Sequence, residues 1–159
     1  MGWVMKNNWS LVLEPTSRAQ WCHLLHQAQG VVGWRMSAGV ESYVLLMLEH
    51  YSEEGGFDCV IALDYMHSLA KSGREKLDGL RHVGDRCLLM TGLFPERIIS
   101  STLPVSYYVG VGQSAYREVA HSVLNVQELA VDRELYLDLS LSFVGVMDVL
   151  TAMRHVSSD

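Results

Sequence analysis

The sequence predicts an all-α protein, an irregular bundle of five or six helices in a single domain that covers residues 1–159. Apolar side chains recur every three to four positions along most of the chain, which is the spacing of one face of a helix. Hydrophobic residues make up 49% of the chain and prolines number only 3. One compact core without long unstructured linkers is therefore expected.

Start and stop signals divide the chain into segments. Thr16 or Ser17 can cap the first helix, and Ser37 can cap the second. Pro95 follows Phe94 and ends the fourth helix, because a residue before proline avoids the α region. The predicted helices cover about residues 16–29, 37–53, 57–71, 74–93, 106–119 and 126–155, with a connector over 98–103.

The last predicted helix has an alternative. Between residues 135 and 143, leucines and a phenylalanine alternate with polar residues, and this spacing also fits a β-strand. We favour the helix because the apolar stripe continues at helical spacing to Met153, and because no second alternating run lies nearby to pair with a strand. An isolated strand would leave its backbone groups unpaired.

The charge of the chain argues against nucleic acid as a partner. The 18 acidic and 12 basic side chains give a formal net charge of −6. Lysine and arginine are scattered along the chain, whereas phosphate binding rests on clustered positive charge. We therefore expect no nucleic-acid partner.

The sequence also predicts a cytoplasmic protein with no membrane partner. Residues 1–14 contain no uninterrupted apolar run after a basic region, which a secretory signal would need. The longest apolar runs are shorter than the roughly 20 residues that cross a bilayer. Three isolated cysteines, Cys22, Cys59 and Cys87, form neither a disulfide framework nor a Cys-x-x-Cys pair, which fits a reducing compartment.

Two neighbouring stretches resemble a known group of proteins. Residues 87–97 contain Gly-Leu-Phe-Pro-Glu at the end of an apolar helix, and residues 105–116 contain Tyr-Tyr followed by Gly112 and the pair Ala115-Tyr116. In these stretches the sequence resembles an uncharacterised family of small bacterial helical proteins, in which a GLFPE turn precedes a YYxxxGxxAY-like helix. The resemblance implies a bacterial cytoplasmic protein and no particular reaction.

Gly110, Gly112 and Ala115 match the Gly-x-Gly-x-x-Ala variant of the dinucleotide fingerprint. In that interpretation the residues just before them form a strand, and Glu128 or Asp132 binds the ribose. The fingerprint needs a parallel sheet around it, while the upstream segments predict helices. We favour the alternative that these small residues allow the close approach of a neighbouring helix.

Two acidic-x-x-His pairs are candidates for a metal site. Asp64 with His67 and Glu118 with His121 have the spacing that places a carboxylate and an imidazole on one helix face, as in the carboxylate-bridged sites of helical bundles. A ligand- or metal-binding protein that uses these four residues, with or without enzymatic activity, is our alternative function. The competing interpretation of both pairs is ordinary solvated helix surface.

The leading prediction is a non-catalytic helical module that binds a protein partner or a second copy of itself, without a cofactor. No nucleophile motif is found, so no catalytic residue is assigned. Aromatic residues and methionine are common in protein interfaces, where an apolar body with a polar tip is an advantage. The predicted contact residues are Trp34, Phe94, Tyr107 and Tyr108.

Overall fold

The computed structural model describes residues 3–6, 10–13, 17–54, 61–99, 102–122 and 132–158. Within these ranges the chain forms eight helices and one two-stranded hairpin, so the predicted all-α fold is confirmed with more helices than the five or six expected. The helices are α1 (Ser17–Val32), α2 (Ala38–Glu54), α3 (Ile61–Leu69), α4 (Gly73–Leu93), α5 (Pro95–Ile99), α6 (Val105–Ser122), α7 (Asp132–Leu141) and α8 (Phe143–Ser158). The strands β1 (Trp3–Lys6) and β2 (Ser10–Leu13) are antiparallel, with Trp3 opposite Leu13.

The predicted starts of the longer helices agree with the structure. The Ser37 hydroxyl accepts the N–H of Val40 at 3.3 Å, which confirms it as the cap of α2. Helix α1 continues through Gly30 and stops at Gly33, whose φ of 77° ends the helix in the left-handed region that glycine favours.

The last predicted helix is two helices. α7 and α8 meet at Ser142 with a bend of 69°. The Ser142 hydroxyl donates to the backbone carbonyl of Asp138, and a serine that bonds back to the preceding turn bends a helix. Residues 135–141 are helical, so the strand alternative is wrong, while residues 126–131 of the prediction lie outside the described residues.

Three short elements differ from the predictions. Helix α5 begins at Pro95, where proline suits the first turn of a helix, and it extends into the connector expected over 98–103. Helix α3 begins at Ile61, and residues 57–60 of its prediction lie outside the described part of the chain. The hairpin, which packs through β2 against α2, was not predicted.

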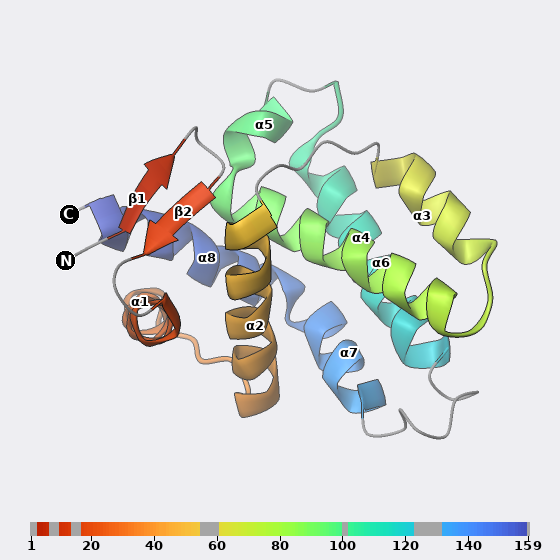
Figure 1. Cartoon of the computed structure of the whole chain (residues 1–159), viewed down its shortest axis with the longest axis horizontal. Coiled ribbons are helices and arrows are strands. Elements are labelled where there is room, and N and C mark those ends of the chain that lie inside the picture. Colours follow the sequence, from red (N-terminus) through yellow and green to blue (C-terminus); the bar gives the residue numbers. More distant parts are fainter. Residues whose placement is uncertain are drawn as a thin grey trace.

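Helix α4 is the centre of the fold. It packs against α3, α6 and α8, and Figure 1 shows it running across the middle of the molecule. Between Val83 and Leu93 every residue except Arg86 is buried. This part of α4 therefore has no polar face, as expected of a helix that other helices surround.

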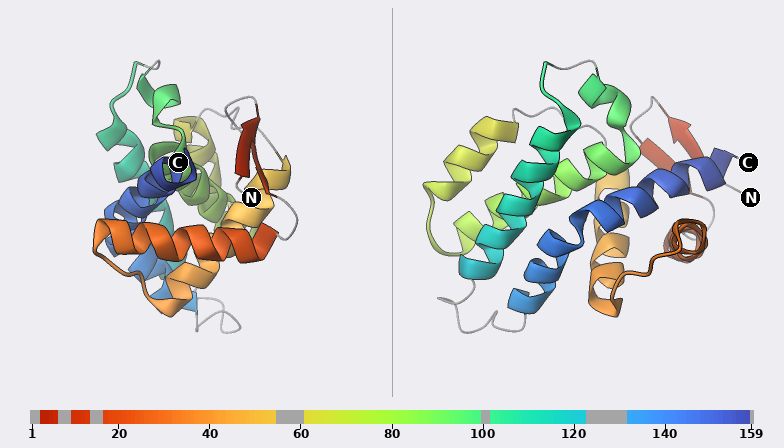
Figure 2. Two further views of the ribbon diagram at one scale, coloured as in Figure 1. Left: turned by 90° about the vertical axis from the view of Figure 1, so that its left-hand side faces the viewer. Right: turned by 180° about the vertical axis from the view of Figure 1, so that it is seen from behind.

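Helices α1, α2 and α7 pack mainly against one another and against the helices that flank α4. Helix α1 packs against α8 and α2, and Figure 2 shows the hairpin on the same side of the molecule as the C-terminal end of α8. Large, fully buried side chains come from three separate helices, Trp21 of α1, Tyr116 of α6 and Phe143 of α8. One continuous core results.

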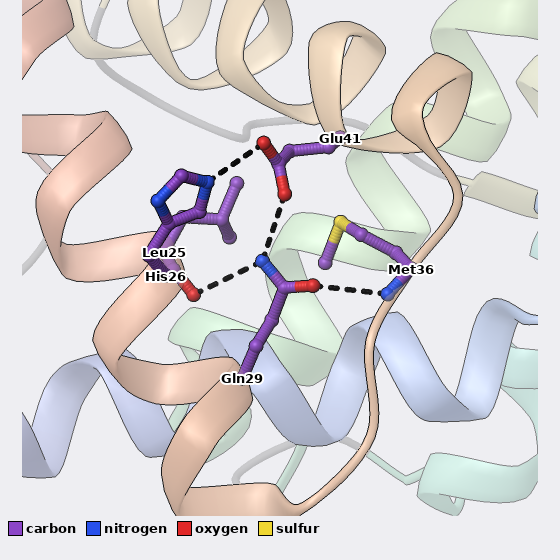
Figure 3. A network of polar contacts seen from close by, with 5 residues as sticks. All are labelled: Leu25, His26, Gln29, Met36 and Glu41. Carbon is purple, nitrogen blue, oxygen red and sulfur yellow. Dashed lines mark hydrogen bonds and ion pairs between the residues drawn. The ribbon is translucent and has the colours of Figure 1, made fainter.

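A polar network holds α1 against α2 (Figure 3). The Gln29 side chain, which is 1% exposed, donates to the Leu25 carbonyl at 3.3 Å and to the Glu41 carboxylate at 3.0 Å, and it accepts the N–H of Met36 at 2.9 Å. His26 bonds the other Glu41 oxygen at 2.9 Å. Partial burial works to raise the pKa of Glu41, but the hydrogen bonds from Gln29 and His26 outweigh it and lower the pKa. The network therefore fixes the turn between the two helices.

Replacement of Gln29 tests this network. Gln29→Leu leaves the buried Met36 N–H without its acceptor and should lower the free energy of unfolding by about 1–3 kcal/mol. The matched control is Gln27→Leu on the exposed side of the same helix, which should change stability little. Urea denaturation measures both, and equal stabilities of the two variants would contradict a structural role for Gln29.

Gly112 allows α6 to approach its neighbours closely. A Cβ at this position would lie 2.6 Å from the Phe143 ring and 2.9 Å from the Cys87 side chain, whereas a Cβ at Gly110 would meet nothing within 4 Å. The close-approach interpretation is therefore confirmed for Gly112 and wrong for Gly110.

These two glycines form a matched pair for a stability test. Gly112→Ala forces Phe143 or α6 to shift and should destabilise the protein by about 1–3 kcal/mol. Gly110→Ala adds a methyl group in open space within the helix and should stabilise it by up to about 1 kcal/mol. Thermal unfolding gives the order of the two variants, and a Gly112→Ala protein as stable as Gly110→Ala would contradict this packing.

Candidate functional site

A pocket of about 410 Å³ opens between α2, α4 and α7, within the size range of small-molecule sites. Its apolar lining comes from Leu46, Met47 and Leu135, and every other lining side chain is aromatic, charged or imidazole. On α2 the lining positions are 43, 46, 47, 50 and 51, and on α4 they are 78, 81, 82 and 85. Helical spacing thus places each set on one face that borders the pocket.

Asp85 is the buried charged group of this pocket. It is 7% exposed, and its Oδ1 accepts the hydroxyl of Tyr43 at 2.6 Å and the hydroxyl of Tyr116 at 2.7 Å. Among the described residues, none donates a hydrogen bond to the second oxygen, Oδ2. The two tyrosines come from α2 and α6, so one carboxylate oxygen joins three helices.

Gly84 makes this arrangement sterically feasible. A Cβ at position 84 would lie 2.7 Å from the ring of Tyr116. The Tyr116 ring therefore rests directly on the backbone of α4, next to the carboxylate that its hydroxyl binds. The centroid of the Tyr116 ring also lies 6.1 Å from that of Tyr136, which lines the pocket from α7.

Burial controls the protonation of Asp85. Loss of hydration raises the pKa of this carboxyl from 3.8 to about 6, although the Tyr43 and Tyr116 hydroxyls and the nearby positive charge of Arg81 act in the opposite direction. Burial also raises the pKa of Tyr43 and Tyr116 well above 10. Both tyrosines therefore stay protonated donors at neutral pH, while Asp85 gains and loses its proton close to it.

The remaining polar groups line the rest of the pocket. The Tyr51 hydroxyl and His82 Nδ1 form a hydrogen bond of 2.6 Å, and their rings stack with centroids 5.5 Å apart. Arg81 forms an ion pair with Asp78 at 3.2 Å and lies in polar contact with Tyr136. The pocket thus combines hydrogen-bond acceptors, donors and aromatic surface, and its carboxyl with a pKa of about 6 is suited to proton exchange with a bound molecule.

The predicted contact residues lie in three different parts of the fold. Phe94, between α4 and α5, is 2% exposed, so its prediction as a partner-binding side chain is wrong. Trp34 is half-buried and packs over Gly145, whose Cβ would lie 2.9 Å from the indole. Tyr107 and Tyr108 are half-buried, with ring centroids 5.4 Å apart. The interaction module stays a prediction, without Phe94.

The two acidic-x-x-His pairs lie on α3 and α6. Asp64 forms an ion pair with Arg86 at 3.2 Å, and His67 and His121 are exposed. Glu118 is half-buried. Within the described part of the chain, no group of three or more His, Cys, Asp or Glu side chains is placed to hold a metal ion. The structure therefore does not bring these four residues together.

The dinucleotide fingerprint does not have its required geometry. Gly110, Gly112 and Ala115 lie inside α6, which begins at Val105, so no strand leads into them. The fingerprint needs a turn between a strand and a helix to bind a pyrophosphate. Glu128 lies outside the described residues, and Asp132 is the first residue of α7.

No known protein family, curated protein or solved structure matches this chain. Among the described helices, none is long and apolar enough by itself to cross a membrane, and only α7 and α8 taken together, bent by 69°, reach that length and composition.

One signal in the sequence indicates this pocket. Asp85 follows Leu80 and Val83 and precedes the apolar run 87–90, so it is a charge within a buried stretch of α4. A charge at such a position is costly unless it is bonded, which makes it a candidate for function. Its partners Tyr43 and Tyr116 are 42 and 31 positions away, and no local spacing indicates them.

The titration of Asp85 should appear in the stability of the protein. Because the native pKa is about 6 and the ordinary value is 3.8, the native chain holds a proton that the unfolded chain has released. This contribution is fully present below about pH 3.8 and is lost as the pH rises through about 6. Relative to Asp85→Asn, the native protein should lose about 2 kcal/mol of unfolding free energy between about pH 4 and pH 7.

Urea denaturation across this pH interval measures the effect. Asp78→Asn, which removes an exposed carboxylate from the same helix, is the control and should leave the pH dependence in place. The unfolding free energy of the native protein minus that of Asp85→Asn should fall as the pH rises. A difference that stays constant or increases with pH would contradict the buried carboxyl.

Proposed function

We propose that this chain is a helical protein that binds a small molecule in the α2–α4–α7 pocket. The observation that carries the proposal is Asp85, a buried carboxylate that lines a pocket together with Arg81 and His82. Well-packed apolar side chains usually serve stability as well as a buried charge does, or better. A charge kept at the wall of a pocket is therefore better explained by a ligand than by folding.

The size and lining of the pocket support the same proposal. A volume of about 410 Å³ suits a molecule of one or two rings, and the lining provides apolar contact at Leu46, Met47 and Leu135. The polar groups are fixed in place before any ligand arrives, since Tyr43 bonds Asp85 and Tyr51 bonds His82. Groups held in this way bind without a large loss of side-chain entropy.

Blocking the pocket tests the proposal. Leu46 lines the pocket and is 57% exposed, so Leu46→Trp should fill space there without disturbing the core. Met66 on α3 is 67% exposed and does not line the pocket, so Met66→Trp is the matched control. Saturation-transfer NMR with a mixed set of small neutral, cationic and anionic aromatic compounds should detect binding to the native protein and to Met66→Trp.

Leu46→Trp should lose most of this signal, by about tenfold or more in affinity for any compound that binds, since a ring and an indole cannot share the space. Binding that persists in Leu46→Trp, or the absence of any bound compound, would refute the proposal. Circular dichroism of both variants checks that each remains folded.

A further inference from the structure

We infer that the pocket accepts an organic cation, an amine or amidine attached to a planar or apolar body, with Asp85 as its counter-ion. The inference rests on the proposed small-molecule function and specifies its ligand class. Three features of the described lining carry it: the balance of charges, the aromatic walls and the hydrogen bonding of Asp85.

Counted without the imidazoles of His50 and His82, the charged side chains that line the pocket carry a net charge of −1. Asp78 and Asp85 are acidic, Arg81 is basic, and Arg81 already pairs with Asp78 at 3.2 Å. Asp85 is bonded instead to two hydroxyl groups, which carry no charge. A cation in the pocket would supply the missing opposite charge, and the net charge of −6 on the whole chain favours its approach.

The aromatic lining suits a cation as well. Tyr43, Tyr51 and Tyr136 border the same pocket, and the rings of Tyr43 and Tyr136 lie edge to face at 5.6 Å. The face of a tyrosine ring attracts a positive charge. An apolar body attached to the cation would find Met47 and Leu135 in the same lining.

Asp85 has the hydrogen-bonding capacity for such a ligand. Both tyrosine hydroxyls donate to Oδ1, so they hold the carboxylate in one orientation and leave Oδ2 without a donor from the described residues. Burial raises the pKa of Asp85 in spite of Arg81 and His50, which means that the present surroundings do not fully stabilise the ionised form. A donor N–H with positive charge would do so.

An anionic ligand fits these observations less well. It would lie near a buried carboxylate, and the guanidinium that could bind it is engaged with Asp78 and Tyr136. A neutral ligand would add no positive charge beside Asp85. The three charge classes are therefore outcomes that one experiment can separate.

The test uses three planar probes of nearly the same shape at pH 8, where an imidazole is ordinarily neutral. Benzamidine is a cation, benzamide is neutral and benzoate is an anion. NMR titration of the protein with each probe gives the three affinities. We expect benzamidine to bind at least about tenfold more tightly than benzamide, and benzoate to bind most weakly.

Two variants assign the selectivity to the pocket. Asp85→Asn keeps an acceptor for the Tyr43 and Tyr116 hydroxyls and removes the charge, so benzamidine should lose about tenfold in affinity while benzamide changes little. Arg81→Gln removes the neighbouring positive charge and should strengthen benzamidine binding. If Asp85→Asn does not fold, the preference for a cation is tested by the order of the three probe affinities on the native protein and by the affinity of Arg81→Gln for benzamidine.

The outcomes separate this inference from the proposed function. Equal affinities for benzamidine and benzamide, or tighter binding of benzoate, would overturn the cation and leave the pocket as a binding site. The proposed preference for a cation is also overturned if none of the three probes binds while other compounds of the mixed set bind the native protein and lose binding in Leu46→Trp. If no compound of any charge binds, the proposed function fails and the inference fails with it.

Discussion

The hydrogen bonds of two tyrosine hydroxyls to the buried Asp85 carboxylate are the interactions on which the rest of this structure depends. A charge removed from water costs several kcal/mol unless it is bonded, and the bonds of 2.6 and 2.7 Å to Tyr43 and Tyr116 offset part of that cost. Because the donors come from α2 and α6, the requirement to satisfy one carboxylate of α4 fixes the relative positions of three helices. The raised pKa of Asp85 shows that the compensation is incomplete.

The pocket is a consequence of this arrangement. Tyr116 reaches Asp85 only because Gly84 has no side chain, and its ring then occupies the surface of α4 that another side chain would cover. Tyr136 of α7 packs against both tyrosines. Its ring centroid lies 5.6 Å from that of Tyr43 and 6.1 Å from that of Tyr116, so Tyr136 closes one side of the pocket beside the carboxylate. A polar wall with a buried charge and an aromatic lining results from the packing of the core itself. The proposed binding site therefore lies beside the centre of α4 and not on an exposed face of the bundle.

The sequence predicted the elements of the fold better than the site. Helical spacing of apolar residues and the cap at Ser37 act within a few positions, so the long helices could be predicted from local patterns. The bend at Ser142 depends on a side-chain bond that apolar spacing does not reveal, and a single helix was expected there. The pocket joins α2, α4 and α7, and its hydrogen-bonded pairs Tyr43–Asp85 and Tyr51–His82 are 42 and 31 positions apart in the sequence. Local motifs instead indicated the acidic-x-x-His pairs and Phe94, because spacing alone does not distinguish a side chain in a site from one on the surface or in the core.

The protonation of Asp85 is the most direct test of the buried carboxylate. An NMR titration that follows the side-chain carboxyl carbon of Asp85, identified by its loss in Asp85→Asn, measures the pKa of this group in the folded protein. We expect a midpoint at about pH 6, since burial outweighs the hydrogen bonds of the two tyrosines. A midpoint near the ordinary value of 3.8 would contradict a dominant effect of burial, because hydration or the hydrogen bonds would then fully stabilise the ionised carboxylate.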